Sequence, residues 1–186
     1  MRRSVLLLAS TALIVLLASG VAVAITLVNC TGGPCEGTEG VDQINGTQEV
    51  DEIFAYGSAD DITGGDGADK IYGGDGGDSI LGDYSASGSD GAGNDVIYGA
   101  GGRDYIYGSG NSDLIDGGPG NDYLGADEFG DDIPGEDTVK GGADNDEIDA
   151  DDGLYDDINC GGGKRDEVVY DRGLDTVTKC ENKTAR

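Results

Sequence analysis

A nine-residue period runs through most of this chain of 186 residues. Residues 64–72 read GGDGADKIY, and residues 73–81 read GGDGGDSIL. Fourteen copies fall in this frame between residues 37 and 178, and each has aspartate at its sixth position and a branched aliphatic residue at its eighth. A short period repeated this often indicates a solenoid, in which one small unit stacks on further copies of itself.

The two invariant positions predict a strand and a turn in every copy. The aliphatic residue and its neighbours suit a short strand whose side chain points inward, and the preceding Gly-rich positions suit a turn. The sixth positions are Asp42, Asp51, Asp60, Asp69, Asp78, Asp95, Asp104, Asp113, Asp122, Asp137, Asp146, Asp156, Asp166 and Asp175. The eighth positions are Ile44, Ile53, Ile62, Ile71, Ile80, Ile97, Ile106, Ile115, Leu124, Val139, Ile148, Ile158, Val168 and Val177.

Composition narrows the choice of partner. With 36 Gly, no Trp and only two Phe, a conventional core is hard to build, and composition alone is typical of a disordered acidic segment. The regular pattern favours an ordered chain instead. The net charge of −27 argues against nucleic acid and against an anionic membrane surface, so a cation is the natural partner.

The turns have the chemistry of a calcium site. Two copies complete a coil of 18 residues, so alternate aspartates lie in a row spaced by roughly 4.8 Å, the distance between neighbouring strands. Such rows repel one another without counterions. Calcium takes six to eight oxygen ligands in flexible geometry, whereas magnesium demands a compact octahedron. Zinc, iron and copper favour His or Cys ligands, which the repeats lack.

The repeat resembles the RTX or haemolysin-type nonapeptide G-G-x-G-x-D-x-U-x, in which U is a large aliphatic residue. The resemblance covers residues 37–178 and implies an all-β fold, a right-handed parallel β-roll that binds Ca²⁺. It weakens where Glu49, Ser58, Leu154 or Lys164 replaces the glycine at the fourth position. The expected carboxylate ligands are Asp51, Asp60, Asp69, Asp78, Asp95, Asp104, Asp113, Asp122, Asp137 and Asp146. The expected carbonyl ligands belong to Gly65, Gly67, Gly74, Gly76, Gly118 and Gly120.

The N-terminus predicts export. Arg2 and Arg3, an apolar run and the small residues Ala22-Val23-Ala24 are typical of a signal peptide over residues 1–24. The competing interpretation is a membrane anchor, because the apolar character continues through Val28. Either way the acidic part lies outside the cytoplasm. The family more often uses a C-terminal secretion signal, so its export route and its toxin association are not carried over.

Four cysteines flank the repeats and predict two local disulfides, Cys30 with Cys35 and Cys160 with Cys180. A shared metal–thiolate site is the alternative, but the two pairs are separated by 125 residues and no His is present. Residues 25–36 are expected to be a Cys-containing linker, and residues 179–186 a C-terminal tail. Lys164 and Arg165 suggest that the last coils replace ions with basic side chains and cap the roll.

Two breaks in the period, residues 82–89 and 126–131, are expected to be loops that bulge from the roll. The ninth positions Phe54, Tyr72, Tyr98 and Tyr107 either cover strand edges or stack on sugars. Cell-surface or extracellular polysaccharide is therefore an alternative partner. An ice-binding face would need an outward Thr ladder, which the repeats lack.

An enzyme is the third class to consider, because larger RTX proteins carry separate catalytic domains. This chain leaves no room for one. It has no His and no G-x-S-x-G elbow, which excludes a His-dependent triad and an H-E-x-x-H zinc site. Paired carboxylates can cleave glycosides, but the repeat already accounts for the aspartates. We expect a monomeric calcium-binding structural protein that is not an enzyme.

Overall fold

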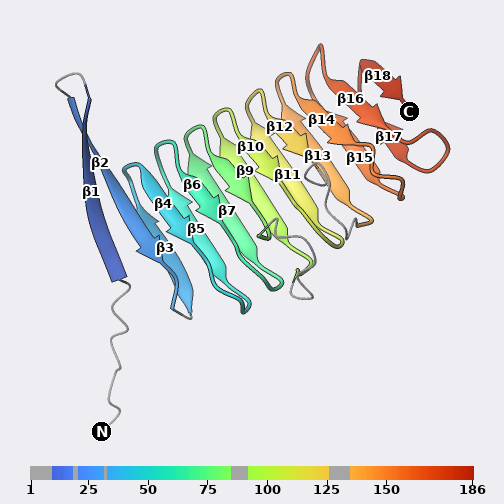
Figure 1. The fold of residues 1–186 in the computed structure, drawn as a ribbon. Helices are drawn as coiled ribbons and strands as arrows, with labels where there is room; N and C mark the ends of the chain where they lie inside the picture. Colours follow the sequence, from blue (N-terminus) through green and yellow to red (C-terminus); the bar gives the residue numbers. More distant parts are fainter. Residues whose placement is uncertain (1–9, 19–20, 32, 85–91, 126–134) are drawn as a thin grey trace, which may run out of the picture.

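The computed structural model describes residues 10–18, 21–31, 33–84, 92–125 and 135–186, and over these ranges the regular structure is β-strand throughout. The chain winds into a parallel β-solenoid of about eight turns, with β1 and β18 at opposite ends of the stack (Figure 1). The expected all-β parallel roll is confirmed.

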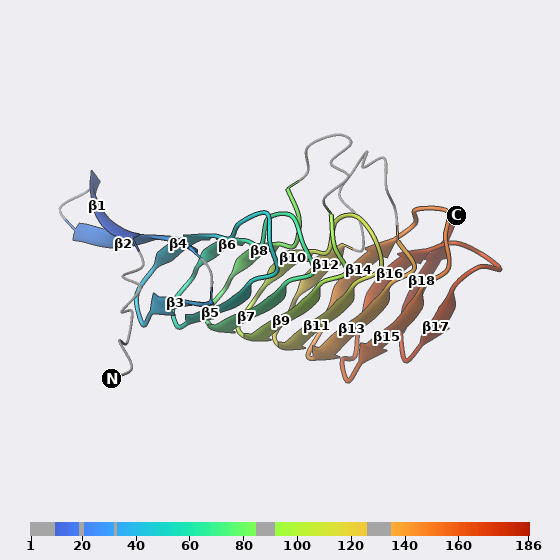
Figure 2. The ribbon, with the colours of Figure 1, turned by 90° about the horizontal axis from the view of Figure 1, so that it is seen from below.

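The described strands alternate between two sheets, which face each other as two layers (Figure 2). The first sheet contains, in spatial order, β1 (Ser10–Ala18), β2 (Val21–Asn29), β4 (Asp42–Asn45), β6 (Asp61–Thr63), β8 (Ser79–Leu81), β10 (Tyr105–Tyr107), β12 (Tyr123–Gly125), β14 (Glu147–Ala150), β16 (Glu167–Tyr170) and β18 (Asn182–Ala185). The second sheet contains β3 (Pro34–Thr38), β5 (Glu52–Tyr56), β7 (Lys70–Asp75), β9 (Val96–Gly101), β11 (Leu114–Pro119), β13 (Thr138–Ala143), β15 (Asp157–Gly161) and β17 (Thr176–Thr178).

The strand register confirms the coil of 18 residues. Ile44 pairs with Ile62 and Ile53 with Ile71, so each residue lies beside its equivalent two copies later. The pairing continues across both breaks in the period, where Ile71 lies beside Ile97 and Leu124 beside Ile148. The register of the stack is therefore the same on both sides of each break. Residues 85–89 of the first break and all of the second, residues 126–131, lie outside the described ranges.

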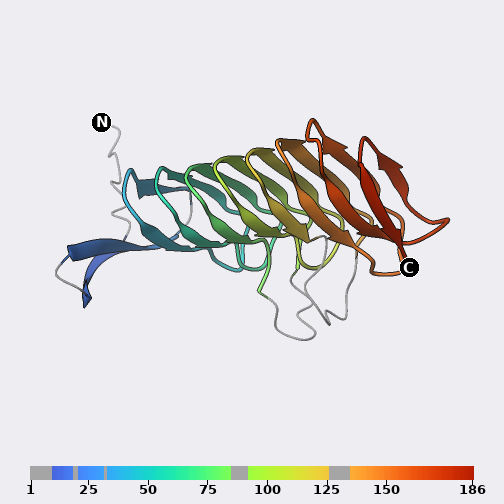
Figure 3. The same cartoon turned by 90° about the horizontal axis from the view of Figure 1, so that it is seen from above.

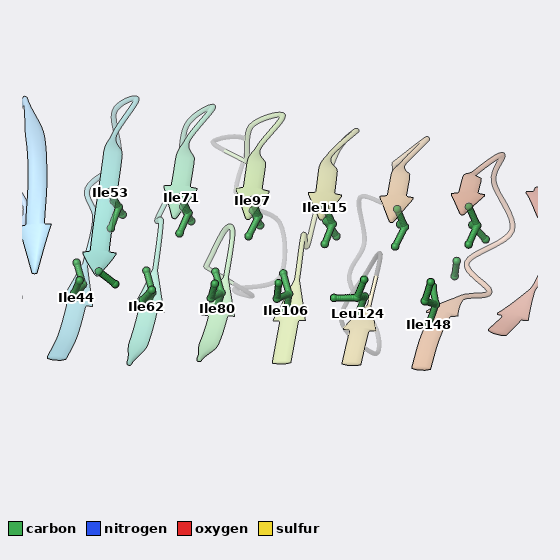
Figure 4. Packing of buried hydrophobic residues seen from close by; sticks show 14 of the residues in the cluster. Ile44, Ile53, Ile62, Ile71, Ile80, Ile97, Ile106, Ile115, Leu124 and Ile148 are labelled. Atoms are coloured by element: carbon green, nitrogen blue, oxygen red, sulfur yellow. The ribbon is translucent and has the colours of Figure 1, made fainter. Parts of the chain in front are cut away.

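Two rows of aliphatic side chains, one from each sheet, fill the space between the sheets (Figure 4). Each strand turns its eighth-position residue inward, and the short strands show one buried residue between two more exposed ones. Ile53, Ile97 and Ile106 are 0% exposed, as are most of their equivalents. The core is thus one residue wide on each sheet, which is why the turns must contribute to stability as well.

The stack extends beyond the expected repeat region at both ends (Figure 3). Part of the expected linker, residues 25–36, lies in β2 and β3, where Thr26 pairs with Asp42 and Cys35 with Ile53. Part of the expected tail, residues 179–186, forms β18 beside β16. β1 lies antiparallel to β2. Among the described residues, no helix is long and apolar enough to cross a membrane.

Candidate calcium sites in the turns

The repeat aspartates are buried although they occupy turns. From Asp42 to Asp166, every sixth-position aspartate is 3% exposed or less. Buried carboxylates are costly unless hydrogen bonds or cations compensate their charge. The two oxygens of each side chain must therefore be accounted for separately.

One oxygen of nearly every repeat aspartate belongs to a ladder of hydrogen bonds along the roll. The backbone N–H of Asp60 donates to Oδ1 of Asp78 at 2.9 Å, and that of Asp78 donates to Oδ1 of Asp104 at 2.8 Å. Equivalent bonds link successive coils in two rows. Row A contains Asp42, Asp60, Asp78, Asp104, Asp122, Asp146 and Asp166. Row B contains Asp51, Asp69, Asp95, Asp113, Asp137, Asp156 and Asp175.

The second oxygen divides the aspartates into two groups. In the ten central ones Oδ2 is buried and has no hydrogen-bond partner within the described chain. An anionic oxygen buried in this way needs a cation, so these oxygens fit calcium. The ten residues are Asp60, Asp69, Asp78, Asp95, Asp104, Asp113, Asp122, Asp137, Asp146 and Asp156.

Burial makes these carboxylates weak acids in the absence of metal. Desolvation raises the pKa of Asp60 and Asp69 to about 7, and that of Asp104 to about 6. The backbone hydrogen bond that each carboxylate accepts from the preceding coil lowers its pKa and offsets part of this increase. The strongest cases are Asp95 and Asp113, whose pKa rises to about 8 and about 10. The nearby Asp83 and the neighbouring aspartates of the row add to both increases. Without metal, ionised aspartate in these turns therefore carries a free-energy cost.

The side chains alone cannot surround an ion. In the part of the chain that the structure describes, no group of three or more acidic, His or Cys side chains is arranged to hold a metal. Calcium requires six to eight oxygens, so backbone carbonyls of the turns must complete each site. That carboxylates and turn carbonyls act together stays a prediction.

The backbone of the central turns brings successive coils into close contact. Five of the six glycines expected to provide carbonyl ligands have positive φ, namely Gly65, Gly67, Gly74, Gly76 and Gly118. A Cβ atom on Gly76 would overlap the carbonyl oxygen of Ser58, and the sixth expected donor, Gly120, would likewise overlap that of Gly102. These positions require glycine because the neighbouring carbonyl oxygens already fill the space around the turn.

Sequence reasoning did not predict that other residues adopt the same turn. At the second and fourth positions of central copies, positive φ is also adopted by Tyr56, Ser58, Ala100, Ser109, Asn111 and Asp144. Such residues are strained by roughly 1 kcal/mol or more each. Their retention in this conformation indicates that the turn shape matters more than the residue type.

The outermost turns satisfy their aspartates without a cation. Asp51, which we expected to be a ligand, differs from the central group: its Oδ2 accepts hydrogen bonds from the backbone N–H of Thr47 at 2.7 Å and from its hydroxyl at 2.8 Å. Thr38 serves Asp42 in the same way. At the other end, Asp171 N–H donates to Asp175 Oδ2 at 2.7 Å.

The C-terminal end closes by a different means from the expected one. Glu181 accepts the N–H of Asp166 at 3.1 Å and so takes the place of a further repeat aspartate. Gly163 N–H, rather than Lys164 or Arg165, donates to the second oxygen of Asp166. The ion pairs found among the described residues are Lys140 with Asp116 and Arg186 with Asp151, and neither involves a repeat aspartate.

Both expected disulfides are present, Cys30 with Cys35 and Cys160 with Cys180. Two acidic residues join the candidate set. Asp156 carries an unpaired Oδ2 like nine of the ten expected ligands, and its place in the frame was its only sequence signal. Asp152, at the second position of the same copy, also has a buried and unpaired Oδ2. No period marks Asp152, so the repeat pattern does not select it.

The aromatic ninth positions cover one another. Phe54 and Tyr72 stack with ring centroids 4.8 Å apart, and Tyr72 and Tyr98 stack at 5.2 Å. Their interplanar angles of 4° and 11° mean that the ring faces are used within the ladder. Tyr107 packs against Tyr123 at 5.8 Å. These contacts favour the edge-covering interpretation over sugar stacking, which needs free ring faces.

A comparison with protein-family models agrees with the geometry. The model for the RTX calcium-binding nonapeptide repeat matches four stretches, residues 36–71, 57–83, 89–124 and 134–153. No curated protein is similar enough in sequence to count as a relative. With matches over more than half of its length, the chain belongs to the family of RTX calcium-binding nonapeptide repeat proteins, whose repeats bind Ca²⁺.

Proposed function

We propose that this chain is a secreted structural protein whose β-roll folds when calcium occupies its central turns. The observation that carries the proposal is the set of ten buried Oδ2 atoms, five in each row, that have no partner among the described residues. Without metal, ionised carboxylates one coil apart repel each other in a site shielded from water. An ion that binds only the folded roll stabilises it, so folding and binding become one event.

The ligands would come from successive coils of one row. Asp60 with Asp78 and Asp104 with Asp122 are such pairs in row A, and carbonyls of the positive-φ turns complete the oxygen set. Bound Ca²⁺ supplies positive charge and a flexible coordination shell. The chain's own contribution is to hold the carboxylates in register through the Asp N–H to Oδ1 ladder, so that their second oxygens face the turn.

Circular dichroism tests this proposal directly. The purified chain is measured in EGTA, then with calcium, then with magnesium at equal concentration. We expect little β-signal in EGTA, full signal with calcium and at most partial recovery with magnesium, whose octahedral preference suits crowded carbonyls less well. An equal β-signal in all three conditions would reject the coupling.

Export would come before folding. Cleavage after Ala24 would remove β1 yet keep Thr26 to Asn29, the residues through which β2 pairs with β4. The two disulfides support an oxidising compartment outside the cytoplasm. N-terminal sequencing of the protein recovered from the medium checks this: a start at Ile25 supports secretion, and retention of the whole chain at the membrane supports an anchor.

A structural role without catalysis completes the proposal. The aspartates are occupied by the hydrogen-bond ladder and the proposed ion sites, and the chain has no His to act as a general base. A screen of the calcium-loaded roll against glycoside substrates tests it. Hydrolysis that a single Asp→Asn substitution abolishes would assign an enzyme instead.

A further inference from the structure

The first two repeat turns differ from the central ones in one residue. Thr38 and Thr47 occupy the second position of their copies, where seven of the ten central copies carry glycine, Tyr56, Ala100 or Ser109 with positive φ. Neither threonine has positive φ. The second position is therefore the point at which the two kinds of turn separate.

The backbone conformation at this position decides where its N–H points. In the threonine turns the N–H donates to Oδ2 of the aspartate four residues later, at 2.5 Å for Asp42 and 2.7 Å for Asp51. With positive φ the N–H turns away: that of Gly65 donates to the carbonyl of Gly82 at 3.0 Å. Oδ2 of Asp69 in that copy is then left without a partner.

The threonine hydroxyl adds a second donor to the same oxygen. Thr38 Oγ1 lies 3.0 Å from Asp42 Oδ2, and Thr47 Oγ1 lies 2.8 Å from Asp51 Oδ2. Hydrogen bonds to a charged acceptor are roughly twice as strong as neutral ones. Two such donors satisfy the oxygen that a cation would otherwise occupy. These two turns therefore need no cation.

The turn before them needs no ion either. Between β2 and β3 the chain carries no aspartate, and the Cys30–Cys35 disulfide closes this turn covalently. It is in register with the stack, because Cys30 N–H donates to the carbonyl of Asn45 at 2.9 Å. Three consecutive turns at the N-terminal end are thus closed by protein groups alone.

We infer that a threonine at the second position closes its turn to calcium, and that the coils spanning β2 to β5 form a metal-independent seed for the roll. A solenoid grows by adding repeats to an existing face, and its first coil is the costly one to form. A preformed seed would set a direction, with calcium-filled coils added from the N-terminal end. This inference rests on the proposed function for the central turns.

Hydrogen exchange with mass spectrometry on the full chain tests it. In EGTA we expect slow amide exchange in peptides from β3 to β5 and fast exchange in peptides from β7 to β14, with calcium slowing the second set. Thr38→Val with Thr47→Val removes both hydroxyl donors and should speed exchange of the seed in EGTA by roughly 10- to 100-fold, the loss of a hydrogen bond to a charged group. Thr38→Ser with Thr47→Ser should keep it slow.

Thr138→Val serves as the matched control, because Thr138 lies in a strand of the central section. It should leave exchange in the seed unchanged. Fast exchange of β3 to β5 in EGTA, or a double valine variant that exchanges like the parent, would overturn the inference even if calcium orders the rest. A chain in which calcium slows no peptide would refute the proposed function instead, and slow exchange of the seed in EGTA would then still stand.

Discussion

Replacing Asp104 with asparagine should stabilise the calcium-free roll and destabilise the calcium-loaded one. The amide oxygen can still accept the N–H of Asp78, now at 2.8 Å from Asp104 Oδ1, so the ladder survives the change. What is lost is the negative charge at the buried Oδ2, which has no partner among the described residues. That charge destabilises the folded roll without metal and binds the ion when metal is present. The effect of the substitution on the free energy of unfolding therefore changes sign when calcium is added.

The magnitude follows from the pKa. Burial raises the pKa of Asp104 from 3.8 to about 6. Two pKa units correspond to about 3 kcal/mol, and screening by solvent around the turn reduces the expected gain in EGTA at pH 8 to about 1 to 2 kcal/mol. With calcium, loss of a charged ligand should cost about 1.5 to 3 kcal/mol.

Urea unfolding followed by far-UV circular dichroism measures both arms, with sucrose added to the EGTA samples to raise the population of the folded roll. Asp51→Asn is the control, since Thr47 already satisfies that carboxylate and its substitution should have the same sign with and without calcium. If Asp104→Asn destabilised the protein equally in both conditions, the assignment of Oδ2 to an ion would be wrong.

Three further outcomes are expected. In EGTA, lowering the pH from 8 to 4 should increase the β-structure of the chain. Folding raises the pKa to about 6 for Asp78 and about 7 for Asp146, so their contribution to stability is fully present below the ordinary Asp pKa and is lost as the pH rises through 6 to 7. A flat dichroism profile over this range would contradict the expectation. Gly102→Ala should prevent coil stacking, because its Cβ would overlap the carbonyl oxygen of Gly76, whereas Gly153→Ala, also at positive φ but with open space around it, should cost only about 1 kcal/mol of unfolding free energy. Ile106→Ala should cost about 2 to 5 kcal/mol with calcium present, measured by urea unfolding, because the side chain is 0% exposed.

The period predicted the stack because both of its signals are local and repeated. Ile44 and Ile62 are two repeats apart, and because one coil contains 18 residues they lie side by side in the sheet. The two disulfides followed from chain proximity. The ends of the stack were harder to predict, because β18 and the start of β3 lack the motif. These segments pair with the exposed edge of the neighbouring strand, β16 or β5.

Within the site, the sequence identified which residues are aspartate but not which of their oxygens are free. Asp51 and Asp69 are equivalent in the motif, yet Thr47 satisfies one and nothing in the described chain satisfies the second oxygen of the other. The difference depends on a φ angle, and residue type is a poor guide to it: Ala100 and Ser109 adopt the glycine conformation. Tertiary stacking imposes that conformation, so single-chain patterns miss it.

The most direct test of the account is calcium stoichiometry, measured by titration calorimetry on the calcium-free chain. Each row holds five unpaired Oδ2 atoms and therefore four successive pairs, so an ion between the members of each pair gives about eight bound ions. We expect a stoichiometry near this number, and we expect the Asp51→Asn variant to bind as many ions as the parent. A chain that binds no calcium, or that loses ions on substitution of Asp51, would contradict it.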